Sequence, residues 1–188
     1  MPGIEWNERL TAVTGAVLIV LLAALGVTIL SIGQLIWWHV LLGMLLIPPV
    51  LLKLASTGWR FVRYYSGTPE YVRRGPPQPL LRLLAPLVVV STLVVFGTGV
   101  ALLVVGPSGG ILVGLHKASF VVWFLATAVH VLAHLRRLLP AAATAGAAWR
   151  GLLVGATIVA GVGVAVMTVR YAHPWVHWFD NGRGRGDG

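Results

Sequence analysis

The sequence contains no cysteine. Disulfide bonds, thiolate metal sites and iron–sulfur clusters are therefore excluded. The N-terminus also lacks the basic segment of a cleaved signal peptide, because Glu5 and Glu8 precede the first arginine, Arg9. The apolar run that follows is too long for a signal peptide. We expect this run to be retained as part of the folded protein.

Charged residues are scarce, at 10% of the 188 residues, whereas 57% of the residues are hydrophobic. Water-soluble domains average roughly 25% charged residues. A chain of this composition cannot cover itself with polar surface, which excludes an ordinary soluble domain. Apolar runs near or above ~20 residues recur along it, and this is the length that a bilayer core requires of a helix. We therefore predict an integral membrane protein with one transmembrane domain at 1–170.

The apolar runs predict an all-α membrane protein built as a bundle of five transmembrane helices. Only "GQ" separates the first two runs and only "GPSGG" separates the third from the fourth. Links this short force neighbouring helices to be antiparallel. No internal repeat with a fixed period is visible. The predicted spans are about 10–32, 35–57, 80–105, 111–135 and 149–170.

Acidic residues are rarer still, which leaves a net charge of +9. The basic residues gather in two links, 59–82 and 136–150. Basic links face the cytoplasm, so the N-terminus is expected inside and the tail at 171–188 outside and partly disordered. The positive charge then reports topology and contacts with anionic lipid, with no need for a nucleic-acid partner. We expect a multi-pass protein of a prokaryotic cell membrane.

One predicted span, "LHKASFVVWFLATAVHVLAH" at 115–134, contains His116, His130 and His134. A helix turns about 100° and rises about 1.5 Å per residue. His130 therefore lies about 21 Å along the axis from His116 and about 40° around it, and His134 lies almost directly in line. All three fall on one face, with His116 near the outer membrane surface and the other two near the inner one.

His39 in the second span shares its predicted depth with His116 in the fourth. Two imidazoles at one depth on separate helices suit the axial positions of a haem iron. Each ring would give one neutral nitrogen to iron, and its other N–H would need a backbone carbonyl or a hydroxyl as partner. The alternative is that both histidines lie at the membrane interface without binding haem. His39 would then belong to an anchoring cluster, "WWH", in contact with the lipid headgroups, and His116 would pair with Lys117 at the surface.

At the inner membrane level no histidine is predicted to oppose His130. His134 cannot do so, because it is on the same helix and one helix cannot supply both faces of a haem. Lys53 follows His39 at the same offset at which His130 follows His116. A neutral Lys53 could oppose His130, or its ammonium could extend to the cytoplasmic headgroups. Two further possibilities are a five-coordinate inner haem, with His130 as its protein ligand, and the absence of an inner haem.

Small and basic residues supply further candidates. Gly97 and Gly99 lie near the proposed outer haem, where small residues let a helix or a flat macrocycle approach closely. Pro48 and Pro49 should kink the second span. The basic and aromatic stretch at 53–74 could hold haem propionates or a quinone headgroup, or lie against lipid.

His173 and His177 follow the last span, four residues apart. They could contact a haem edge, a metal or a partner protein. An interfacial anchor together with the neighbouring tryptophans is the alternative.

The histidine-containing segments "WWHVLLG", "LHKAS" and "HVLAH" resemble those of the bacterial membrane b-type cytochromes, the cytochrome b561 and nickel–iron-hydrogenase cytochrome b group. The resemblance covers about 35–138. It implies a bundle that holds one or two b haems between the second and fourth helices. It also implies His39 and His116 as the outer iron ligands and His130 as an inner candidate. The absent fourth histidine departs from the family pattern.

On this resemblance we expect electron transfer between a quinone pool and a partner redox protein. The chain would be an electron-transfer subunit of an oxidoreductase, with no catalytic residue of its own. The alternatives are a haem-free membrane anchor or assembly subunit, or a small transporter. A transporter would need paired broken helices and midplane polar groups, of which Ser91 is the main example.

Overall fold

We describe the chain from a computed structural model, which describes residues 2–73, 75, 79–143 and 148–184. These residues are helical almost throughout and contain no strand. Five helices are long and apolar enough to cross a membrane, which confirms the prediction at that level. They are α1 (Pro2–Leu30), α2 (Ile32–Tyr65), α4 (Pro79–Val105), α5 (Gly110–Ala143) and α6 (Ala148–Thr168).

The helices extend beyond the predicted spans. The end of α2 is an example, since it reaches Tyr65 and not about 57. The backbone hydrogen bonds of α2 continue past the end of its apolar run. Side chains one turn apart stabilise this polar end of the helix, since the Arg63 guanidinium lies 5.3 Å from the Trp59 ring centroid. The helix ends before Gly67, whose φ of 76° favours glycine. A short helix, α3 (Pro69–Val72), follows.

The tail after α6 is helical over most of its length. A 3₁₀ turn, η1 (Val169–Ala172), leads into α7 (His173–Gly184), and only 185–188 lie outside the described part. The buried Trp175 indole donates to the Leu102 carbonyl of α4 at 3.1 Å. The Phe179 ring lies against Gly33, where a Cβ would be 3.3 Å from it. These contacts hold the tail as a helix against α2 and α4.

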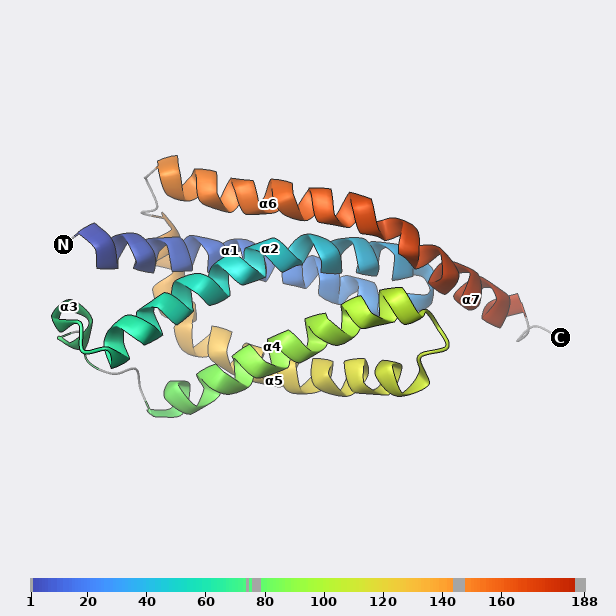
Figure 1. The fold of residues 1–188 in the computed structure, drawn as a ribbon, viewed down its shortest axis with the longest axis horizontal. Coiled ribbons are helices and arrows are strands. Elements are labelled where there is room, and N and C mark those ends of the chain that lie inside the picture. The colour runs from blue at the N-terminus through green and yellow to red at the C-terminus, as the bar shows by residue number, and fades with distance from the viewer. Residues whose placement is uncertain (1, 74, 76–78, 144–147, 185–188) are drawn as a thin grey trace.

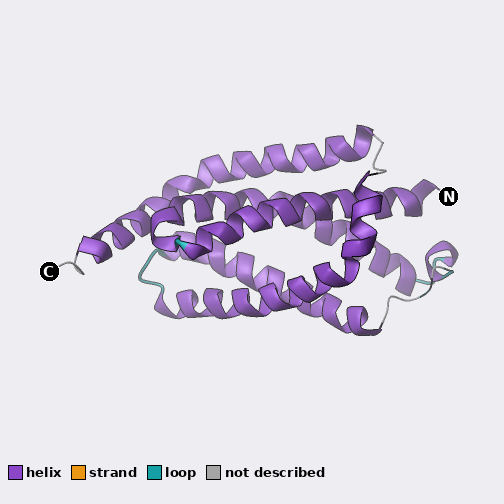
Figure 2. Cartoon of the chain, turned by 180° about the vertical axis from the view of Figure 1, so that it is seen from behind, coloured by secondary structure: helices purple, strands orange, loops and turns teal. Residues whose placement is uncertain are grey.

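Two helical hairpins organise the fold. The first consists of α1 and α2, joined at Ser31, and the second of α4 and α5, joined at 106–109. Within each hairpin the two helices pack closely, and the hairpins meet through α1 against α5 and, less closely, α2 against α4. The four helices thus form a ring in which α2 and α5 are diagonal. Both hairpin turns lie at the same end, opposite the N-terminus (Figures 1 and 2).

The fifth long helix, α6, packs along the outside of α2 (Figure 1). Pro49 has no N–H, so the Leu45 carbonyl one turn earlier loses its helical donor. Gly161 of α6 is buried against this carbonyl, and a Cβ at Gly161 would overlap the Leu45 oxygen. The two prolines thus lie within a continuous helix, and the carbonyl that Pro49 releases becomes the point of closest approach to α6.

Candidate cofactor site between the two hairpins

His39 of α2 and His116 of α5 lie at the end of the ring that contains both hairpin turns. The two side chains are half-buried. In the described part of the chain, α2 and α5 are not among the helix pairs that pack closely. The two predicted ligands thus lie on opposite corners of the ring, at its end with both hairpin turns, and the pairing of their side chains on one iron stays a prediction.

Each histidine is held by a threonine of its own hairpin. In the first hairpin, Thr28 Oγ1 lies 2.8 Å from His39 Nδ1. The same hydroxyl donates to the Leu25 carbonyl of α1 at 2.5 Å. The Thr28 side chain therefore connects the α1 backbone to the His39 ring.

The second hairpin repeats this arrangement. Thr98 Oγ1 of α4 lies 3.0 Å from His116 Nδ1. Thr98 also contacts carbonyls of its own helix, those of Val94 at 2.7 Å and Val95 at 3.1 Å. A hydroxyl was one of the two partners predicted for the second ring nitrogen, and neither threonine was among the predicted site residues.

The two candidate glycines of α4 behave differently. A Cβ at Gly99 would lie 3.2 Å from His116 Cε1 and 3.7 Å from Nδ1, so glycine lets this ring rest on the α4 backbone. At Gly97 a Cβ would meet no atom within 4 Å. Gly97 instead lines an open groove of about 330 Å³ between α2 and α4, together with Phe96 and Val100. Gly99 thus lies against a candidate ligand, whereas Gly97 lines a groove to which neither His39 nor His116 contributes.

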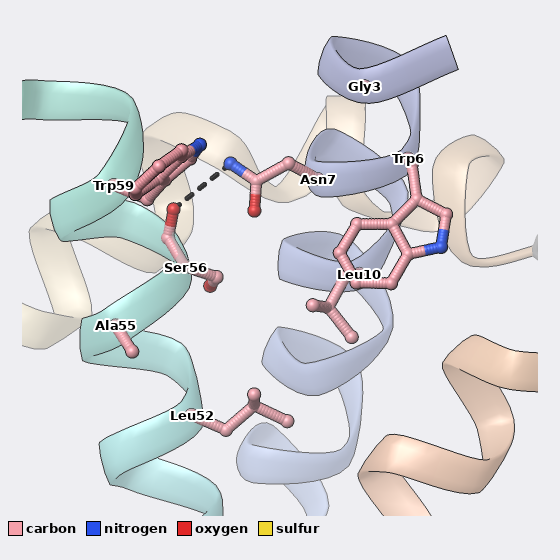
Figure 3. A pocket seen from close by; sticks show the side chains of 8 residues that line it. All are labelled: Gly3, Trp6, Asn7, Leu10, Leu52, Ala55, Ser56 and Trp59. Atoms are coloured by element: carbon pink, nitrogen blue, oxygen red, sulfur yellow. Dashed lines mark hydrogen bonds between the residues drawn. The ribbon is translucent and has the colours of Figure 1, made fainter. Parts of the chain in front are cut away.

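The opposite end of the first hairpin contains a polar cluster around Lys53. Lys53 Nζ donates to the Thr11 carbonyl at 2.7 Å, which links α2 to α1. Thr11 Oγ1 donates to Ser56 Oγ at 3.0 Å, and Asn7 Nδ2 donates to the Ser56 carbonyl at 3.1 Å. Figure 3 shows the Asn7 contact beside an open groove of about 390 Å³ that Trp59 also lines. Lys53 thus has a role in helix pairing that the sequence did not suggest.

The remaining histidines are not gathered at one place. His130 of α5 is half-buried, and the side chain of His134 lies outside the described part. His173 and His177 are exposed on α7. Among the residues that the structure describes, no group of three or more histidine or acidic side chains is placed to hold a bare metal ion.

Replacing Lys53 with methionine should leave haem binding unchanged and keep or raise the temperature of unfolding. Methionine matches the length of the lysine stem and removes a half-buried charge that has to be partly desolvated. The measurement is the visible spectrum of protein supplied with haemin, followed by thermal unfolding in detergent. A change in the iron coordination signal would show that Lys53 is an iron ligand and would contradict this assignment.

No family model, curated protein or solved structure matches this chain. Its function therefore has to be argued from the site.

Proposed function

We propose that this chain is a membrane b-type cytochrome that holds one haem b between His39 and His116 and transfers electrons between a quinone pool and a partner redox protein. One observation carries the proposal. Two imidazoles from diagonal helices lie at the same end of an apolar helical ring, and each has its Nδ1 engaged by a threonine. This leaves Nε2 of each ring as the nitrogen available to a metal.

The donor set is what an iron porphyrin requires of a protein. The macrocycle supplies four nitrogens, so two axial imidazoles complete six-coordinate iron. A bare zinc-type ion would need three or four protein ligands. Haem, when bound, supplies one-electron iron chemistry. The chain's own residues orient the two rings, and the apolar surroundings of the site limit the access of water.

The local packing supports a flat ligand at this level. Gly99 lets the His116 ring lie against α4. The less close packing of α2 against α4 leaves the groove that Gly97 lines, further along the ring from the two histidines. A bulky side chain at Gly99 would occupy the space that the His116 ring takes.

A single haem is the better proposal. Lys53, the residue that matches the offset of His130, has its ammonium on the Thr11 carbonyl of α1. That contact directs Lys53 into the α1–α2 interface. We therefore propose one haem at the level of His39 and His116, near the external face if the basic links are cytoplasmic.

The test is the colour and haem content of the purified protein. Protein extracted from membranes in mild detergent should show a Soret band, and sharp α and β bands after reduction by dithionite. A pyridine haemochrome assay should give haem b at one per chain. A folded, colourless preparation that also fails to take up added haemin would overturn the proposal.

A further inference from the structure

We infer that Thr28 and Thr98 set the tautomers of His39 and His116, so that each ring carries its proton on Nδ1 and presents the lone pair of Nε2. The inference rests on the proposed function for the identity of the metal. The tautomers themselves follow from hydrogen bonds within the protein and are expected in the haem-free chain.

A threonine hydroxyl has one proton to donate. Thr28 Oγ1 lies 2.5 Å from the Leu25 carbonyl oxygen, which can only accept. The hydroxyl proton must lie between these two oxygens, because their lone pairs would otherwise face each other at this distance. Thr28 Oγ1 therefore accepts at its 2.8 Å contact with His39, and Nδ1 of His39 is the donor.

The same reasoning applies to the second hairpin. The hydroxyl proton of Thr98 is shared with the Val94 and Val95 carbonyls, at 2.7 and 3.1 Å. The oxygen of Thr98 then accepts from His116 Nδ1 at 3.0 Å. This contact places the proton of neutral His116 on Nδ1.

The consequence lies at the other nitrogen. A neutral imidazole with its proton on Nδ1 has its lone pair on Nε2, and a metal binds this lone pair. The two threonine contacts both engage Nδ1, which leaves Nε2 of each ring for a metal. Each hairpin therefore supplies one positioning residue on its first helix and one ligand on its second. A hydrogen bond to Nδ1–H also makes the ligand more electron-donating.

Nitrogen NMR of the haem-free protein tests this directly. Protein with ¹⁵N-labelled histidine in lipid nanodiscs should show the Nδ1–H tautomer at His39 and His116. Thr28→Val should shift only His39 towards a mixture that contains Nε2–H, and Thr98→Val should shift only His116. Thr28→Ser and Thr98→Ser keep the hydroxyl and should keep the wild-type tautomers.

Thr168→Val is the matched control. The Thr168 hydroxyl donates to the Val164 carbonyl of its own helix at 2.6 Å, just as Thr28 and Thr98 donate to theirs. It contacts neither candidate ligand, so both histidine signals should stay unchanged. All three valine variants remove a hydroxyl that bonds to its own helix. Only Thr28→Val and Thr98→Val also remove a contact with a histidine, so the control isolates the effect of that contact.

A second readout uses added haemin. Loss of an outer-shell partner typically weakens metal binding roughly 10–100-fold. We expect weakening of this order for Thr28→Val and Thr98→Val, together with a higher reduction potential, because the less electron-donating ligand stabilises ferric iron less. The serine variants should behave as wild type.

Two results would overturn the inference: the Nε2–H tautomer at either histidine in the wild-type protein, or tautomers that do not change in the valine variants. Failure of the haem proposal would look different. The NMR result would hold, while haemin would not bind.

Discussion

Replacement of either His39 or His116 by alanine should abolish the low-spin haem signal of this protein. The two rings come from diagonal helices, which are not among the closely packed helix pairs of the described residues, so each helix supplies one ligand to the proposed haem. Each variant should leave iron with a single protein ligand, and the sharp α band of the reduced protein should disappear. The measurement is the reduced-minus-oxidised spectrum at equal haemin and protein concentrations.

Methionine at these positions provides a more specific test. A thioether can bind haem iron, and methionine–histidine ligation raises the reduction potential relative to two histidines. His39→Met and His116→Met should therefore retain six-coordinate haem with a higher potential, which simple unfolding would not produce. His173→Ala and His177→Ala, exposed on α7, are the controls and should show the wild-type spectrum. A full low-spin signal in both alanine variants would contradict the assignment.

The fold could be predicted from composition because the apolar runs are long and their links short. The hairpins of α1 with α2 and of α4 with α5 follow directly from links too short for any other geometry. The shared level of His39 and His116 follows from the same topology. These features depend on helix length and chain direction, both of which the sequence contains.

The register of the two predicted hairpins also bears on the threonines that contact the histidines. Folding the chain about residues 33–34 places position 28 opposite His39. Folding it about 106–110 places position 100 opposite His116, at the depth of Thr98 but on a different face of the helix. Hairpin register therefore predicts the Thr28 contact and only the depth of the Thr98 contact. The two pairs have different separations in sequence, so they do not form a repeat of fixed period.

Other contacts could not be predicted in this way. The Lys53 ammonium reaches the Thr11 carbonyl because of a side-chain direction that no periodicity specifies. The helical tail is anchored by the Trp175 indole, which donates to the Leu102 carbonyl 73 positions earlier in the sequence. Such contacts depend on how separate helices meet, and a single sequence without related sequences contains little information about that.

Replacement of Gly161 by alanine should destabilise the protein while leaving the histidine site intact. A Cβ at this position would overlap the Leu45 carbonyl, so α6 would have to move away from α2. Overpacking of this kind typically costs about 1–3 kcal/mol. Because α6 lies outside the ring that holds His39 and His116, the haem spectrum should change little. The measurement is unfolding by heat or denaturant in detergent, followed in parallel by the haem spectrum.

Gly163→Ala is the matched control for this prediction. Gly163 lies two residues further along α6, is exposed, and has no atom within 4 Å of a Cβ placed there. Alanine favours helix over glycine by about 1 kcal/mol, so this variant should be as stable as wild type or slightly more so. The difference in unfolding stability between Gly161→Ala and Gly163→Ala gives the effect of the contact with the Leu45 carbonyl, separated from the effect of helix propensity. Equal stability would mean that the seam between α2 and α6 tolerates a methyl group, and that the carbonyl released by Pro49 does not set their approach.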